Sequence, residues 1–160
     1  MTIESRMREL GLVLPGAFAV PGGATFPFAW VRVHGNRAFV SGHAPLNADG
    51  SLAEPLGKVG AEVTIEQASR AARLTGLAML ASLQRELGQL DRITGWLRVF
   101  GMVNAAPGFS QMPTVINGFS DLIIQIFGKE VGMHSRSAVG MAELPFRIPV
   151  EIEAEVEVRP

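Results

Sequence analysis

The chain closes with Val150-Glu151-Ile152-Glu153-Ala154-Glu155-Val156-Glu157-Val158, in which apolar and acidic residues alternate without exception. Successive side chains of a β-strand point to opposite faces, so the alternation predicts a strand with one buried face and one face of glutamates. Such an acidic face is usually solvated, or guards a sheet edge against aggregation. It can also present a carboxylate to a ligand, and the alternation alone is compatible with both interpretations.

A second strand is predicted just upstream, over Ser135–Met141, and its shortness favours a largely buried position. In an extended chain His134, Arg136, Ala138 and Gly140 share one face. A long cation flanked by small residues leaves space for a ligand beside it. The alternative is that Arg136 belongs to a structural ion pair.

The first third of the chain predicts a short helix over Ile3–Leu10, followed by a loop over Pro15–Pro27 that is rich in proline and glycine. Next comes a strand-like segment with a turn at Gly35-Asn36, which predicts a β-hairpin over Ala29–Ser41.

A capping box formed by Thr64 and Gln67 predicts a helix that continues to about Leu87. The nearly continuous apolar run over Arg92–Asn104 predicts a central strand covered on both faces. Ser110–Phe127 predicts a second helix, with the serine as its N-cap and a glycine after its last residue. The order hairpin, helix, strand, helix, strand, strand predicts one mixed sheet with two helices on one face, and the other face free for a partner.

Composition narrows the class of protein. The 160 residues carry a net charge of −1, and 48 % of them are hydrophobic. We expect one domain over residues 1–160, in which residues 1–28 form an N-terminal helix and loop extension. The sequence contains no basic stripe of the kind that would predict nucleic-acid binding, and no apolar run reaches the length of a membrane span. The apolar surplus instead favours an oligomer.

Two further classes of site are disfavoured. The chain has no cysteine, and its histidines, at positions 34, 43 and 134, have no metal-ligand spacing, so we expect neither a metal nor a cofactor. Glu4 and Glu9 stand where a signal peptide would need positive charge, which predicts a cytoplasmic protein.

The residues Arg136-Ser137-Ala138-Val139-Gly140, Leu144-Pro145 and Val150-Glu151-Ile152-Glu153-Ala154 together resemble the closing signature of the RidA/YjgF family. These proteins are enamine and imine deaminases, also described as endoribonuclease L-PSP. Ser41-Gly42-His43-Ala44-Pro45-Leu46 is similar to a second family segment, with His43 in place of the usual glutamine. Pro113-Thr114-Val115-Ile116-Asn117-Gly118 looks like the longer-chained branch of the family.

This resemblance implies an α+β, chorismate-mutase-like fold in which the last strand inserts antiparallel into the sheet. It also implies a homotrimer with clefts between subunits, which bind a small carboxylate and hydrolyse reactive enamines or imines to a keto acid and ammonia. Arg136 would bind the substrate carboxylate through its planar fork of donors, and Glu151 would orient the attacking water. The resemblance also implies six substrate-binding residues, which are Ser41, Gly42, Phe28, Asn117, His134 and Ala138.

The chain departs from the short deaminases at two positions. It has no tyrosine, and Phe26 or Phe28 stands near the place of the family tyrosine, while Ala138 replaces a cysteine. His134 either replaces the missing hydroxyl or is a partly buried structural histidine. The two-residue period places Glu151 and Glu153 on one face, so only the motif selects Glu151.

Two other functions are compatible with the sequence. One is a non-catalytic trimeric module that binds small carboxylates, since the tyrosine and cysteine are missing. The other is an endoribonuclease, which the scattered histidines and the lack of a basic patch disfavour.

Overall fold

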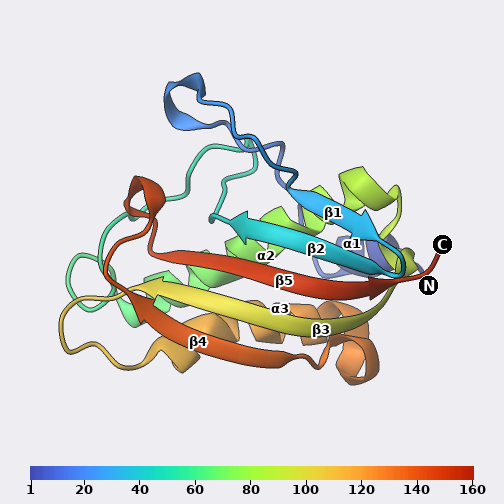
Figure 1. The fold of residues 1–160 in the computed structure, drawn as a ribbon. Helices are drawn as coiled ribbons and strands as arrows, with labels where there is room; N and C mark the ends of the chain where they lie inside the picture. The colour runs from blue at the N-terminus through green and yellow to red at the C-terminus, as the bar shows by residue number, and fades with distance from the viewer.

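Five strands form one mixed sheet in the order β1-β2-β5-β3-β4 (Figure 1). Their bounds are β1 Val31–His34, β2 Arg37–His43, β3 Ile93–Asn104, β4 Ser135–Met141 and β5 Val150–Val158. β3 and β4 are parallel, and every other neighbouring pair is antiparallel. The last strand therefore lies inserted between β2 and β3, which confirms the α+β, chorismate-mutase-like arrangement. The structure is a computed structural model that describes residues 1–160.

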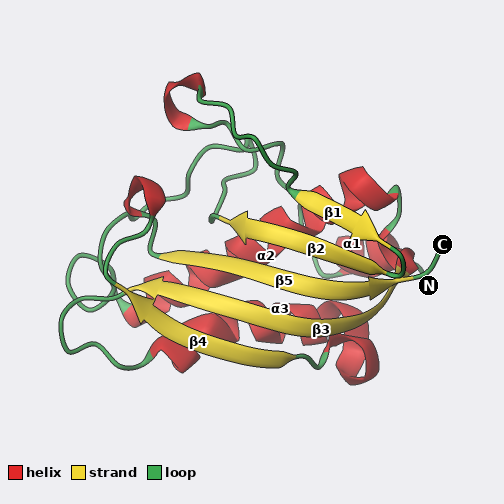
Figure 2. Cartoon of the chain, viewed as in Figure 1, coloured by secondary structure: helices red, strands yellow, loops and turns green.

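Three helices accompany the sheet: α1 Ile3–Glu9, α2 Ile65–Leu87 and α3 Met112–Gly132. Short 3₁₀ turns cover Pro21–Gly23, Leu90–Arg92 and Pro145–Arg147. Figure 2 shows the two long helices on one face of the sheet, as predicted. The capping box of α2 is present, because the side chains of Thr64 and Gln67 each accept a hydrogen bond from the other's backbone amide. None of the helices has the length and apolar character needed to cross a membrane.

Helix α3 begins and ends differently from the prediction. Its N-cap is Gln111, not Ser110, and Pro113 occupies the first turn, where its missing N–H costs nothing and its fixed φ suits a helix. Gly128 adopts a φ of 75°, which interrupts the helix after Phe127 as expected, but a further helical turn follows as far as Gly132.

The main core lies between the helices and one face of the sheet. The alternation of β5 is confirmed, because Val150, Ile152, Val156 and Val158 are buried in this core. The glutamates of β5 therefore lie on the opposite face, which no helix of the chain covers and which we call the open face.

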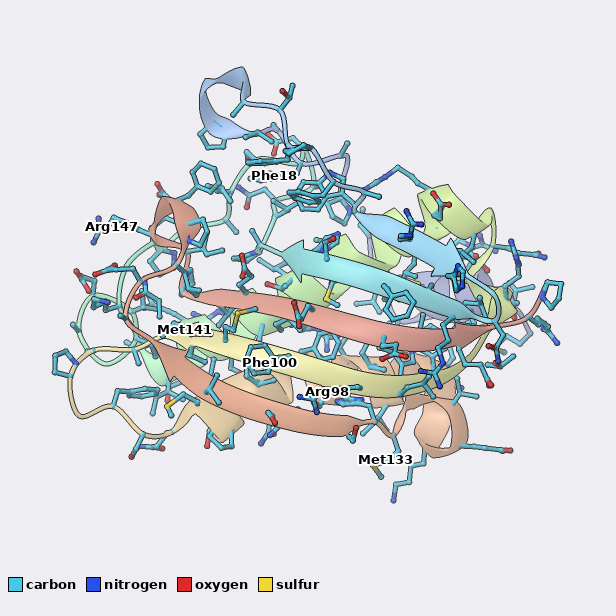
Figure 3. The ribbon with its side chains drawn as sticks, in the orientation of Figure 1. Phe18, Arg98, Phe100, Met133, Met141 and Arg147 are labelled. Atoms are coloured by element: carbon cyan, nitrogen blue, oxygen red, sulfur yellow. The ribbon has the colours of Figure 1, made fainter.

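Two strands are less covered than predicted. β4 lies at the edge of the sheet and most of its residues are half-buried, so the expected largely buried strand is wrong. β3 is covered on both faces only at its C-terminal end, where Met102 packs against Leu144 and Ile148. Farther back, Arg98 is exposed and Phe100 half-buried on the open face, where Figure 3 shows both in front of the sheet. The reason is that one chain supplies helices to one face alone.

Candidate functional site

Arg136 projects from the edge strand toward α3. Its neighbour across the parallel ladder is Val99, which is buried in the helix-facing core. Nη1 of Arg136 donates to Asn117 Oδ1 at 2.9 Å and to Ser120 Oγ at 3.0 Å, and Nη2 donates to the Pro113 carbonyl at 3.3 Å. All three acceptors are neutral, and no ion pair forms at this guanidinium. Its charge is therefore not neutralised within the chain, and N–H donors remain free for an anion.

His134 is tied into the same group, which we call the arginine cluster (Arg136, Asn117, Ser120 and His134). Its Nδ1 lies 2.8 Å from the Gly132 carbonyl, and its Nε2 lies 2.9 Å from Ser120 Oγ. Because a carbonyl only accepts, Nδ1 carries the proton of the neutral ring and Nε2 accepts from the serine hydroxyl. Burial, followed by the charge of Arg136, lowers the pKa of His134. Nδ1 thus fixes the ring to the Gly132 carbonyl, and Nε2 holds the serine that orients Arg136.

A pocket of about 250 Å³ lies apart from the arginine cluster, at the end of the sheet where β5 begins. Figure 2 shows loops gathered at this end. We call it the aromatic pocket, and it is lined by Phe18, Phe26, Phe28, Trp30, Gly42, Ala44, Pro145, Phe146, Ile148 and Glu151. The rings of Phe26 and Phe28 are stacked with centroids 5.4 Å apart, and that of Trp30 meets Phe28 edge-on at 5.0 Å.

Glu151 is the one charged side chain of this pocket. It is half-buried, and its carboxylate has neither a hydrogen-bond donor nor a cation as partner. Burial, followed by the charge of Glu153, raises the pKa of Glu151 above its ordinary value of 4.5. Gly42 makes room for the carboxylate, because a Cβ at position 42 would lie 2.9 Å from Glu151 Cδ.

The other glutamates of β5 are placed differently. Glu155 is paired with Arg37 at 2.6 Å, and Glu157 accepts a hydrogen bond from Thr94 Oγ1 at 2.8 Å. Glu153 is exposed and lies outside the aromatic pocket. The two-residue period of the sequence predicts the same environment for all four glutamates. Their different neighbours on β2 and β3 give each of them a different environment.

Of the remaining predicted residues, Phe28 and Gly42 line the aromatic pocket. Ser41 does not, since its hydroxyl donates to the Ala29 carbonyl at 2.8 Å. Ala138 lies beside Gly101 on the helix-facing side of β4. Sequence reasoning missed Ser120, although it lies one turn from Asn117 on the face of α3 that meets Arg136.

His43 lies behind the aromatic pocket and is buried. Its Nδ1 donates to the Ser41 carbonyl at 2.5 Å, and its Nε2 accepts from the hydroxyl of Ser82 at 2.8 Å. Burial lowers its pKa to about 4, so the ring is neutral at physiological pH. It supports Trp30, whose ring centroid is 5.2 Å away.

One chain does not bring the arginine cluster and the aromatic pocket together. Arg136 pairs with Val99 and Glu151 with Met102, and these two positions of β3 face opposite sides of the sheet. Two strand spacings and three residues along the strand separate their Cα atoms by about 14 Å. A site using both residues therefore needs a second copy of the chain.

Comparison with known proteins places the chain among proteins of this fold. Residues 4–149 match the family described as "YjgF/chorismate_mutase-like, putative endoribonuclease". Protein TCP17 of Trypanosoma cruzi is 39 % identical over 156 residues, which span 98 % of this chain and 94 % of that protein.

Two solved structures are similar throughout. Atu1372 of Agrobacterium tumefaciens, a protein of unknown function, is 39 % identical with a TM-score of 0.87, over 98 % of this chain and 92 % of that one. A protein of Shewanella oneidensis described as "a putative endoribonuclease" is 30 % identical with a TM-score of 0.87, over 99 % and 100 % of the two chains. The chain belongs to the RidA/YjgF family.

Proposed function

We propose that the protein hydrolyses reactive 2-imino acids, or their enamine tautomers, to the keto acid and ammonia. The site lies in a cleft between two subunits of a cytoplasmic homotrimer, where the arginine cluster of one chain meets the aromatic pocket of the next. Arg136 binds the substrate carboxylate with its free donors, while Asn117 and Ser120 hold the guanidinium in place.

Glu151 handles the protons. Its carboxylate takes one proton from water as the oxygen attacks the iminium carbon, and the C=N electron pair moves to nitrogen, which gives a carbinolamine. The protonated Glu151 then returns this proton to the amine. The C–N bond breaks as the hydroxyl oxygen forms the carbonyl, and the hydroxyl proton passes to Glu151 and leaves with ammonia. Each step balances without a cofactor.

The observation that carries this proposal is the unpartnered carboxylate. Burial without a partner disfavours the ionised form of a glutamate and so raises its pKa. A raised pKa lies nearer the pH at which a proton shuttle operates. Gly42 is the feature that permits this placement. A purely structural glutamate would gain from a cation or donor, as Glu155 does from Arg37.

The test is ammonia release from an imine generated in situ by an amino-acid oxidase with catalase. The protein should accelerate release, and Arg136→Ala should abolish the acceleration; Arg136→Lys should restore only part of it, because lysine lacks the bidentate fork. Arg32→Ala, at an exposed arginine on β1, is the matched control. No acceleration by the wild-type protein with any imine would refute the proposed hydrolysis.

A carboxylate-binding module without turnover is the second candidate. It is favoured by the absence of any hydroxyl among the side chains of the aromatic pocket, which leaves Glu151 as its sole charged side chain. It predicts that pyruvate or benzoate raises the melting temperature of the wild type but not of Arg136→Ala, with no ammonia release. For the endoribonuclease function, RNA cleavage would have to be lost in the Arg136→Ala and Glu151→Gln variants.

A further inference from the structure

The aromatic pocket is larger and more apolar than the smallest substrates of the proposed reaction require. Its 250 Å³ would hold about eight waters at liquid density, and a three-carbon enamine would leave most of that space unfilled. The pocket is open to solvent, and Phe26, Phe28 and Phe146 are exposed within it, so a large apolar group would remove apolar ring surface from water.

The rings present their surfaces to one common space. Phe18 meets Trp30 and Phe146 edge-on with centroid distances of 6.0 Å, and Phe26 meets Trp30 at 6.1 Å. A further aromatic ring entering the group could pair with these rings edge-to-face or offset-stacked, which are the favoured arrangements of aromatic pairs. The pocket's single charge, Glu151, is complementary to an iminium nitrogen at the pocket wall.

The backbone is strained where it delivers one of these rings. Phe146 and Arg147 both adopt a φ of 58°, in the left-handed region that side chains other than glycine rarely occupy. Residues are kept in such conformations only when their surroundings over-determine them, and they cluster at ligand sites. The strained turn makes Phe146 a wall of the aromatic pocket.

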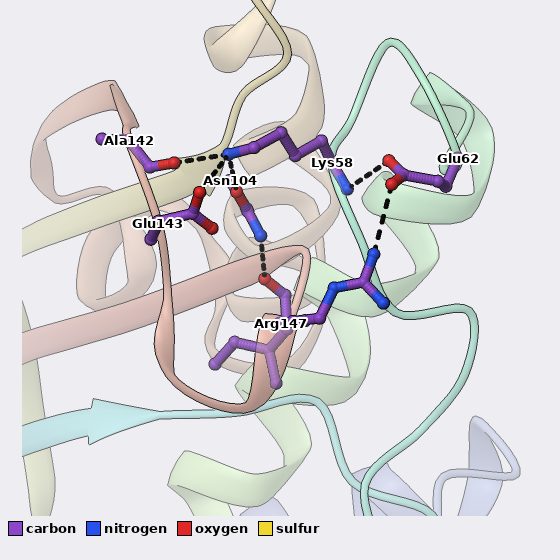
Figure 4. Close-up of polar contacts among 7 residues, drawn as sticks. Lys58, Glu62, Asn104, Ala142, Glu143 and Arg147 are labelled. Carbon is purple, nitrogen blue, oxygen red and sulfur yellow. Dashed lines mark hydrogen bonds and ion pairs between the residues drawn. The ribbon is translucent and has the colours of Figure 1, made fainter.

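Figure 4 shows the side-chain contacts around this turn. Arg147 pairs with Glu62 at 3.2 Å, and its carbonyl accepts from the Gly57 amide at 2.7 Å. The next carbonyl, of Ile148, accepts from Asn104 Nδ2 at 3.3 Å, and Asn104 Oδ1 in turn accepts from Lys58 Nζ at 2.9 Å. These contacts come from the loop after β2 and from the end of β3, so two other segments of the chain hold the turn that carries Phe146.

We propose that the aromatic pocket is the side-chain subsite of the deaminase, and that its substrate is an imino acid with an aromatic or comparably bulky apolar side chain. Phe146 is a specificity-determining residue of this subsite. That the ligand is a substrate rests on the proposed function, but the binding preference of the pocket can be measured without turnover.

The first measurement compares products. Phenylpyruvate should raise the melting temperature of the protein at concentrations at least about ten-fold lower than pyruvate, since each apolar group that fills a pocket contributes roughly ten-fold or more in discrimination. Phe146→Ala should remove most of this preference. Phe109→Ala, which truncates a phenylalanine that lies outside the pocket, should keep it.

The second measurement compares kcat/KM for imines made by an oxidase from phenylalanine and from alanine, with the same ten-fold or larger preference expected. Equal or tighter binding of pyruvate, or equal turnover of the alanine-derived imine, would overturn the subsite while leaving the deaminase function intact. Preferential binding of phenylpyruvate with no turnover of either imine would support the subsite and refute the deaminase. A Phe146→Ala variant with an unchanged preference would refute the assignment of Phe146 as a specificity-determining residue.

Discussion

At the scale of single residues, burial disfavours the ionised carboxylate of Glu151, which has no partner. Because its pKa is higher in the folded than in the unfolded state, its contribution to stability is present below about pH 4.5 and is lost as the pH rises through the folded pKa. Glu151→Gln should therefore raise the melting temperature at about pH 7.5 and change it little at about pH 4. The same variant should lose about a hundred-fold or more in deaminase activity.

The control for this prediction is Glu153→Gln. This neighbour is exposed, and its charge is the second cause of the raised pKa of Glu151. Glu153→Gln should keep activity and shift the acidic limb of the pH–rate profile to lower pH, since the carboxylate base then forms more readily. A Glu151→Gln variant that is less stable than the wild type at neutral pH would contradict the assignment of an unpartnered carboxylate.

His43 makes the opposite contribution to the pH dependence. Its folded pKa of about 4 lies below the ordinary 6.5, so the folded state binds fewer protons and stability falls as the pH drops through this window. The loss between pH 7 and pH 5 should be about 2 kcal/mol. His43→Gln, which restores the residue usual in the family, should remove that loss, as measured by urea unfolding at the two pH values.

His34→Gln is the matched control, because His34 is exposed at the end of β1 and has no buried partner. It should keep the wild-type pH dependence. If His43→Gln lost as much stability as the wild type over the same range, another group would have to carry the effect.

At the scale of elements, the two long helices approach each other at a glycine. A Cβ added to Gly118 of α3 would lie 2.1 Å from the Ser69 carbonyl oxygen of α2, and a backbone atom cannot rotate away. Gly118→Ala should therefore lower the free energy of unfolding by about 2 kcal/mol or more, despite the better helix propensity of alanine.

Gly95→Ala is the comparison for this change. Position 95 lies on β3 with ordinary φ, and its nearest contact to an added Cβ is at 3.7 Å, so we expect a change within about 0.5 kcal/mol. Equal stabilities of the two variants in denaturant unfolding would mean that α2 and α3 can separate without cost.

Local sequence signals predicted the elements well where the signal is itself local. The capping box of α2 and the alternation of β5 depend on residues within one turn or one strand. The N-terminus of α3 was predicted wrongly, because Ser110 is a common capping residue while Pro113 decides where the first turn begins. The covering of β3 on both faces was predicted correctly only for its C-terminal end, because no stretch of sequence states how many layers a fold has.

The site is a less local property. Alternation places Glu151 on a strand face and small neighbours single out Arg136, so sequence and resemblance together predict both as site residues. Their opposite faces follow from the pairing of β4 and β5 with β3, a register set by contacts far apart in the chain. The aromatic pocket collects rings from the N-terminal loop and the Pro145–Arg147 turn, and no periodicity relates these segments.

At the scale of the whole molecule, the proposed site needs residues from two chains, and this can be tested with inactive parents. Arg136→Ala keeps Glu151, and Glu151→Gln keeps Arg136, so each variant alone should be inactive. In oligomers that contain both, a cleft with Arg136 from one chain and Glu151 from its neighbour is wild-type. Random mixing should restore roughly a quarter of the clefts, measured as ammonia release after co-expression.

A second mixture separates the two possible site architectures. The double variant Arg136→Ala/Glu151→Gln, mixed randomly with equal wild type, leaves roughly a quarter of the sites intact if each is shared between chains, and roughly half if each lies within one chain. Light scattering establishes the size of the oligomer, and differently tagged chains establish that mixing occurred. Inactivity of the mixed single variants in verified mixed oligomers would contradict a shared site. Because Arg136 and Glu151 face opposite sides of one sheet, that result would leave them with separate roles.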